Sequence, residues 1–132
     1  MAGESILIVD DNPVNLKLAR VLLTADGYEV RTATAAEEAL DILKDFRPRL
    51  ILMDVQLPGM DGLELTRRLK ADPRMREVVI VALTAYAMKG DEERALAAGC
   101  DGYIGKPIDT RRLAAQVAGL LARPGKIEGD AS

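Results

Sequence analysis

Short apolar runs alternate with amphipathic segments along the whole chain. The runs at 6–9, 50–53 and 78–83 are continuous and bounded by turn residues, as in strands that are buried on both faces. Weaker runs at 28–32 and 102–104 complete a set of five candidate strands. This alternation predicts an α/β domain in which a parallel sheet is covered by helices on both faces, giving three α/β/α layers.

Between the candidate strands, apolar side chains recur at helical spacing. Three such stripes are Val14, Leu18, Val21, Leu22 and Ala25; Ala36, Ala39, Leu40 and Leu43; and Leu113, Val117, Leu120 and Leu121. Pro13 and Asp61 suit the first positions of helices. Gly27 and Gly99 suit the left-handed positions that end helices, and Pro48 is expected to end the second helix. We therefore expect each strand to be followed by one helix.

The length and composition narrow the class of protein. A chain of 132 residues is long enough to bury one core, and we expect a single domain over 4–122 followed by a short polar tail at 123–132. Its one cysteine, Cys100, permits no internal disulfide and is expected to be a small core residue rather than a redox sensor. The N-terminus does not resemble a signal peptide, and no apolar run could span a bilayer, so we expect a cytoplasmic protein without membrane insertion.

Charge and residue usage also limit the chemistry. The chain has no histidine, which excludes histidine triads, histidine metal sites and a phosphohistidine of its own. A net charge of −3 gives no general attraction to a phosphate backbone, and only four aromatic residues are available to stack on bases. We therefore expect no direct binding to nucleic acid. Carboxylates, hydroxyls and lysines remain as the side chains that could carry out the chemistry of this protein.

Polar residues of this kind stand at the ends of the candidate strands. Asp10 and Asp11 follow the first strand, Asp54 the third, Thr84 the fourth and Lys106 the fifth. In an open parallel sheet the carboxyl ends of the strands form the ligand-binding edge, so these groups are expected to converge. Two carboxylates about 4 Å apart repel by about 4 kcal/mol at an effective dielectric constant of about 20, so the cluster requires a cation.

The ligand types indicate which cation and which reaction. Oxygen ligands without histidine or cysteine favour a hard divalent ion such as Mg²⁺, usually in company with a phosphate. A carboxylate nucleophile, a lysine and a hydroxyl that donate to phosphoryl oxygens fit phosphoryl transfer. Lys106 and Thr84 are the candidate donors.

Four blocks of sequence then carry a resemblance to a known family. The segments at 6–12, 52–62, 83–85 and 105–107 read ILIVDDN, LMDVQLPGMDG, LTA and GKP. In this order and spacing they resemble the receiver domain of two-component response regulators, over about residues 4–122. The stretch AYAMKGDEER further resembles DivK-type single-domain receivers and the receivers of hybrid kinases. The resemblance implies a doubly wound, flavodoxin-like and CheY-like (βα)5 fold with strand order 2-1-3-4-5.

The family's phosphorylation chemistry transfers to matching positions. The resemblance makes Asp54 the phosphoacceptor and, with Asp11, a ligand of Mg²⁺, for which Mn²⁺ can substitute. Asp10 would act through the water shell of the metal, and the main-chain carbonyl of Gln56 would complete the set. Lys106 would bridge to the phosphoryl group.

The resemblance also implies a switch and a partner surface. Thr84 would move toward the phosphoryl group, and Tyr103 would then turn from an exposed to a buried position. Gln56 and Tyr86 would flank the site, and the bulk of Tyr86 is expected to give the phosphorylated form a lifetime of many minutes. Asn15 is expected to lie on the surface, where it could face a partner kinase domain.

The expected function is a stand-alone receiver that accepts phosphate from a histidine kinase or a histidine phosphotransfer protein. Its output would be contact with a downstream protein through the fourth helix, fifth strand and fifth helix, as a monomer or weak dimer. It would not be an enzyme beyond its own phosphorylation and dephosphorylation. A phosphate sink without an output partner is an alternative that the sequence leaves open.

Two other classes share parts of this pattern. Phosphatases of the haloacid dehalogenase type use an Asp-x-Asp motif after the first strand, whereas this chain has Asp10 and Asn12 there. A flavodoxin-like redox carrier needs a hydroxyl-rich phosphate loop at that position, and Asp10 and Asp11 would repel the phosphate. Both alternatives are therefore less suitable than a receiver.

Overall fold

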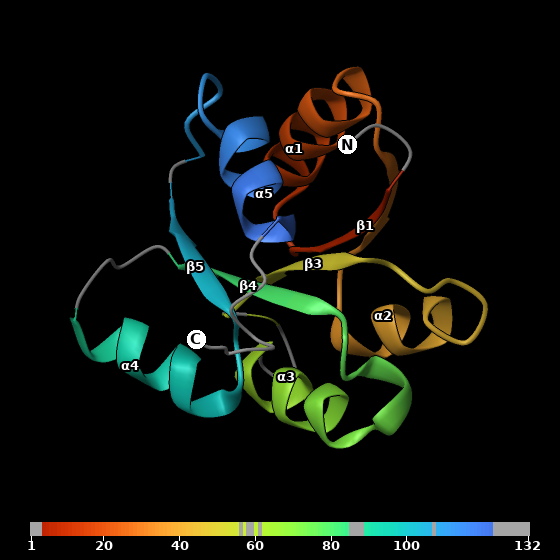
Figure 1. Cartoon of the computed structure of the whole chain (residues 1–132), viewed down its shortest axis with the longest axis vertical. Helices are drawn as coiled ribbons and strands as arrows, with labels where there is room; N and C mark the ends of the chain where they lie inside the picture. The colour runs from red at the N-terminus through yellow and green to blue at the C-terminus, as the bar shows by residue number, and fades with distance from the viewer. Residues whose placement is uncertain are drawn as a thin grey trace.

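A five-stranded parallel sheet forms the centre of the protein (Figure 1). The computed structural model describes residues 4–55, 57, 60, 62–84, 89–106 and 108–122. The strands are β1 (Ser5–Val9), β2 (Glu29–Ala33), β3 (Leu50–Asp54), β4 (Val79–Thr84) and β5 (Gly102–Gly105). Their order across the sheet is β2-β1-β3-β4-β5, which confirms the predicted fold and strand order.

Helices cover both faces of this sheet. They are α1 (Pro13–Ala25), α2 (Ala36–Ile42), α3 (Gly62–Ala71), α4 (Lys89–Ala98) and α5 (Leu113–Leu121), with a short 3₁₀ turn, η1 (Pro73–Met75). Figure 1 shows α1 and α5 on one face and α2, α3 and α4 on the other. Within the described ranges, no helix has both the length and the apolar character that crossing a membrane requires.

The alternation of side chains along each strand explains the two cores. In β1, Ile6 and Ile8 pack with the residues of α1 and α5, whereas Leu7 and Val9 pack with those of α2, α3 and α4. The central strand β3 is buried along its whole length. Continuous apolar runs are therefore required in the centre of the sheet, as the sequence predicted.

Local signals set most of the helix boundaries. The Asn12 side chain accepts hydrogen bonds from the backbone N–H groups of Val14 and Asn15, at 2.9 and 3.2 Å, and Pro13 occupies the first helical position of α1. Gly27 and Gly99 have φ of 97° and 110°, as predicted for residues that follow helix ends. Asp61, the predicted start of α3, lies outside the described residues.

The prediction that Pro48 ends the second helix is wrong. The helix ends at Ile42, and the chain continues through turns in which the Phe46 backbone N–H donates to the Ile42 carbonyl at 3.0 Å. Phe46 is buried in the core beneath α2, and the Arg31 guanidinium lies 4.5 Å from its ring centroid. The chain thus leaves the helix at Ile42 and places the Phe46 ring in the core two residues before Pro48.

Cys100 is a core residue, as predicted. It is 6% exposed and lies in the cluster beneath α2, α3 and α4. Its thiol donates to the Thr66 hydroxyl at 3.9 Å, and burial raises the pKa of the thiol. A buried thiol with a raised pKa is poorly suited to redox sensing.

Candidate functional site

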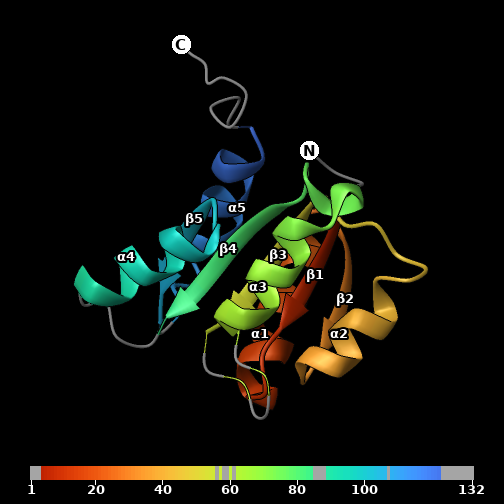
Figure 2. The same cartoon turned by 90° about the horizontal axis from the view of Figure 1, so that it is seen from below.

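The carboxyl ends of the parallel strands lie at one edge of the sheet (Figure 2). The predicted polar residues stand at these ends. Asp10 directly follows β1, while Asp54 and Thr84 are the last residues of β3 and β4. Lys106 follows β5, and its backbone N–H donates to the Thr84 carbonyl at 2.8 Å. Four side chains that are distant in sequence therefore share one edge, as predicted.

Three carboxylates form the centre of this edge. Asp10, Asp11 and Asp54 each offer an oxygen, and these oxygens lie within 4.8 Å of one another. Asp10 and Asp54 are buried, whereas Asp11 is exposed. The carboxylates of Asp10 and Asp54 thus form the buried part of the site, and the Asp11 carboxylate forms its solvent-exposed part.

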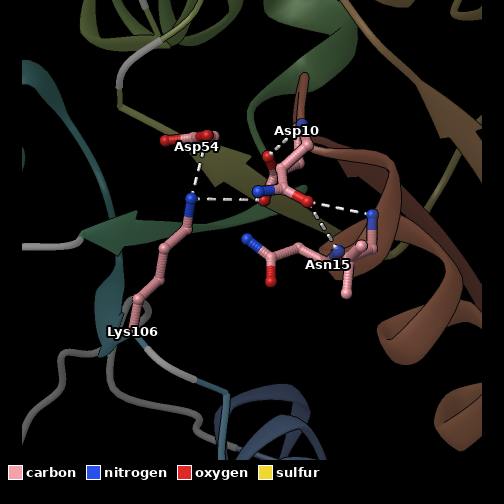
Figure 3. A network of polar contacts seen from close by, with 6 residues as sticks. Asp10, Asn15, Asp54 and Lys106 are labelled. Atoms are coloured by element: carbon pink, nitrogen blue, oxygen red, sulfur yellow. Dashed lines mark hydrogen bonds and ion pairs between the residues drawn. The ribbon is translucent and has the colours of Figure 1, made fainter.

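Lys106 is the cation that pairs with the two buried carboxylates (Figure 3). Its Nζ donates to Asp54 Oδ2 at 3.0 Å and lies 3.3 Å from Asp10 Oδ2. Burial alone would lower the pKa of this lysine, but the hydrogen bond to Asp54 and the charges of Asp10 and Asp54 outweigh burial and raise the pKa. Lys106 is therefore a fixed positive charge across the neutral pH range.

The residues present fit a hard divalent cation. The ammonium group of Lys106 balances only one of the three negative charges of Asp10, Asp11 and Asp54. Asp10 Oδ1 accepts a hydrogen bond from the Asn12 backbone N–H at 2.9 Å, but the buried Oδ2 makes no hydrogen bond despite its ion pair with Lys106. A buried carboxylate oxygen with unused acceptor capacity, in an all-oxygen donor set, suits Mg²⁺ or Mn²⁺.

The two predicted switch residues occupy neighbouring strands. Thr84 is 3% exposed at the end of β4, next to Gly105 of β5 in the sheet register. Tyr103 lies on the outer side of β5 and is 43% exposed. Gln56 and Tyr86, predicted to flank the site, lie outside the described residues.

Gly62 is a site-shaping residue whose role the sequence analysis missed. It begins α3 and is buried directly against the Asp54 main chain. A Cβ atom at this position would collide with the Asp54 carbonyl oxygen and lie 2.9 Å from the Asp54 carbonyl carbon and from Val55 Cα. The glycine is visible in the sequence, but its contact forms only when α3 folds back onto β3.

A second unforeseen group lies at the other end of the sheet. Lys70 Nζ donates to Asp101 Oδ2 at 2.8 Å and to the Val78 carbonyl at 3.1 Å. The same Asp101 oxygen accepts from the Ile80 backbone N–H at 2.9 Å. This group, which we call the Lys70–Asp101 clamp, joins α3 to the amino ends of β4 and β5. No local pattern predicts it, because its members are far apart in sequence.

Comparison with known proteins agrees with this geometry. Residues 6–118 match the profile of the response regulator receiver domain. The polar-differentiation response regulator DivK of Brucella anthropi is 48% identical over 118 residues, covering 89% of this chain and 96% of the relative.

Solved structures show the same fold. The receiver domain of a sensor histidine kinase from Pseudomonas aeruginosa PAO1, with a magnesium ion in its active-site cleft, matches with a TM-score of 0.83 and 37% identity, covering 92% of this chain and all of that one. The chemotaxis response regulator CheY4 of Vibrio cholerae matches with a TM-score of 0.85 and 26% identity, covering 90% of this chain and 99% of that one. These matches favour a receiver over the phosphatase and redox-carrier alternatives. With its acidic edge, its paired lysine and this match along most of its length, the chain belongs to the response regulator receiver family.

Proposed function

We propose that Asp54 accepts a phosphoryl group from a phosphohistidine of a histidine kinase or a histidine phosphotransfer protein. The observation that carries this proposal is the position of the Asp54 carboxylate, buried at the strand edge and 3.0 Å from Lys106 Nζ. A carboxylate oxygen of Asp54 attacks phosphorus, the P–N bond breaks, and its electron pair leaves with the imidazole nitrogen. The product is an acyl phosphate on a signalling protein.

The residues around Asp54 supply charge and donors for this step. Lys106 already faces the Asp54 carboxylate, so its ammonium group can donate to a phosphoryl oxygen after a small shift. The Thr84 hydroxyl, on the adjacent strand, is the second donor. Both groups already lie at the site before transfer, so only short movements are needed to bring them to the phosphoryl oxygens.

A divalent ion is part of the proposal. Asp10, Asp11 and Asp54 are the residues that would hold Mg²⁺ or Mn²⁺. The resemblance to the receiver family adds the main-chain carbonyl of Gln56 to this set. When bound, the ion would neutralise negative charge on the phosphoryl oxygens. The magnesium ion described for the Pseudomonas aeruginosa receiver supports this assignment.

The expected test measures intact mass after incubation with acetyl phosphate and Mg²⁺. Wild-type protein is expected to gain one phosphoryl group, about 80 Da, and Asp54→Asn is expected to gain none, because the nucleophile is lost. The matched control is Asp41→Asn, whose side chain is 76% exposed on α2. This control should react like wild type. Equal labelling of wild type and Asp54→Asn, or no labelling of wild type, would contradict the assignment.

We further propose that phosphorylation acts on a face formed by α4, β5 and α5, where a downstream protein binds. Leu96 of α4 and Tyr103 of β5 are exposed apolar residues on these elements, 52% and 43% accessible. The register places Thr84 beside Gly105, two residues from Tyr103. Movement of Thr84 toward the phosphoryl group would open space for the tyrosine ring.

Tyr103 is therefore expected to become protected in the activated state. Beryllofluoride, which imitates a phosphoryl group, should slow nitration of Tyr103 by tetranitromethane about threefold or more, because burial removes the ring from solvent. Peptide mass spectrometry reads each tyrosine separately. Tyr28, 4% exposed, is the internal reference and should react slowly in both states. Equal nitration of Tyr103 with and without beryllofluoride would rule out this switch.

A further inference from the structure

Asn15 lies in the first turn of α1, directly beside the acidic edge. Its backbone N–H donates to the Asn12 side chain at 3.2 Å, which fixes the start of the helix. In Figure 3 the Asn15 side chain extends from α1 toward Lys106. It is partly buried, whereas the preceding Val14 is 71% exposed on the outer side of the helix. The Asn15 side chain therefore lies on the side of α1 that faces the site in Figure 3.

The side-chain amide of Asn15 has no hydrogen-bond partner among the residues that the structure describes, although its backbone N–H is paired. Partly enclosed polar groups usually have a partner in the protein or in bound water or ligand. Its neighbours toward the site are charged, with Lys106 and Asp10 already paired to each other. The amide is thus an uncharged donor and acceptor that remains available at the rim of a charged site.

The outer side of the same helix carries an open apolar groove. Pro13, Val14, Lys17, Leu18 and Val21 line this groove, which has a volume of about 490 Å³. The groove begins at Pro13, two residues after the exposed carboxylate Asp11. Asn15 follows Val14 of this groove in the first turn of α1.

We propose that the side-chain amide of Asn15 contacts the phosphodonor during transfer, with Nδ2 donating to a phosphoryl oxygen of the incoming group. This inference rests on the proposed phosphoacceptor role of Asp54. An amide carries no charge, so it accommodates donors whose leaving group is anionic, as in an acyl phosphate, and donors whose leaving atom is nitrogen. A carboxylate at the same place would distinguish the two by charge.

Two small donors separate these cases. With acetyl phosphate, Asp54 attacks phosphorus, the P–O bond breaks, and acetate leaves with the electron pair. With phosphoramidate, the P–N bond of the protonated nitrogen breaks, and ammonia leaves with its three hydrogens. Both reactions leave the same acyl phosphate on Asp54, so any difference between them reports on the donor and not on the product.

The experiment measures phosphorylation rates with both donors at saturating Mg²⁺ for wild type, Asn15→Ala and Asn15→Asp. Asn15→Ala is expected to slow both reactions about tenfold, because one hydrogen bond to a charged oxygen is lost. Asn15→Asp is expected to raise the ratio of the phosphoramidate rate to the acetyl phosphate rate about fivefold, because the new carboxylate repels the acyl phosphate and attracts the ammonium end of phosphoramidate. Arg20→Ala, an exposed change farther along α1, should leave both rates and their ratio unchanged.

The outcomes distinguish failure of this inference from failure of the proposed function. Suppose that wild type is phosphorylated. If both Asn15 variants then keep the wild-type rates, or keep the wild-type ratio while only their unfolding temperature changes, Asn15 does not contact the phosphodonor. If wild type is not phosphorylated by either donor, both the role of Asp54 and that of Asn15 are wrong. A ratio that rises only in Asn15→Asp supports the contact, since a purely structural role would affect both donors equally.

Discussion

Replacing Lys106 with methionine is expected to slow phosphorylation by acetyl phosphate at least about 100-fold, the usual effect of losing a positioned donor to a developing charge. The methionine side chain has a similar length but supplies neither charge nor hydrogen. In the protein as it stands, Lys106 Nζ already contacts Asp54 Oδ2 at 3.0 Å, so the donor lost is the one nearest to the nucleophile. Time courses of intact mass at saturating Mg²⁺ measure this effect.

The same substitution is also expected to lower the free energy of unfolding in the absence of Mg²⁺ by about 3 kcal/mol. Asp10 and Asp54 are buried, and without Lys106 their charges would face each other with no ammonium group between them. Addition of Mg²⁺ should restore part of the loss, because the ion binds the folded protein and replaces the missing positive charge. Urea denaturation with and without Mg²⁺ gives both values.

Lys44→Met is the matched control for this stability measurement. Lys44 pairs with Asp41 at 3.4 Å, but both side chains are about three-quarters exposed, at 75% and 76%. An exposed pair of this kind contributes about 0–1 kcal/mol, so the control should change little and should not respond specifically to Mg²⁺. Equal stability losses in the two variants, or a Lys106→Met loss that Mg²⁺ does not reduce, would contradict the role of Lys106 as the charge-balancing group.

Gly62→Ala is expected to lower the free energy of unfolding by about 3 kcal/mol, the upper part of the range for overpacking. The added Cβ would collide with the Asp54 carbonyl oxygen, and main-chain atoms cannot rotate away as a flexible side chain can. Either α3 or the end of β3 must therefore move. Denaturant unfolding followed by far-ultraviolet circular dichroism measures the change.

Gly119→Ala is the matched control for Gly62→Ala. At Gly119, in the last turn of α5, an added Cβ meets nothing within 4 Å. Alanine is favoured over glycine inside a helix by about 0.5–1 kcal/mol, so this variant should be more stable than wild type. The idea that α3 is seated on the Asp54 main chain would be wrong if both glycine substitutions changed stability in the same direction and by similar amounts.

Gly62→Ala also separates the packing of α3 from the chemistry of the site. Movement at this contact displaces the main chain that carries Asp54, while Asp10 and Lys106 are held by other strands. We therefore expect slower phosphorylation of the folded variant, with no change in Gly119→Ala. Rates measured well below the denaturation midpoint test this separately from stability.

The sequence predicted the fold and the main site residues because both depend on regular patterns. Five apolar runs with helices between them specify a parallel sheet, and polar residues placed at the strand ends must then meet at one edge. Asp10, Asp54 and Lys106 illustrate this, since each stands directly at the end of its strand and the structure joins all three by contacts of 3.0 and 3.3 Å. The position of each residue at the end of its strand was sufficient to predict that the three side chains lie close together.

Other features depend on contacts that no local pattern encodes. Pro48 suggested the end of the second helix, yet the helix ends at Ile42 and Phe46 is buried in the core before the proline. The contact of Gly62 with Asp54 depends on how closely α3 approaches β3. These are consequences of three-dimensional packing, so they are available only from the folded structure.

Because of the Lys70–Asp101 clamp, the amino ends of β4 and β5 are held by side-chain contacts different from those at their carboxyl ends. At the amino ends of β4 and β5, one lysine and one carboxylate hold α3 and both strands through contacts of 2.8 to 3.1 Å. At the carboxyl ends, Lys106 Nζ contacts the Asp54 carboxylate at 3.0 Å, and this contact would have to change if Asp54 is phosphorylated as we propose. A change of charge at the proposed phosphoacceptor Asp54 would thus act at the end of the sheet opposite the clamp. We therefore expect β5 to move least at its amino end, beside Asp101, and most at its carboxyl end, beside Lys106. Such a movement would change the angle of the strand in the sheet.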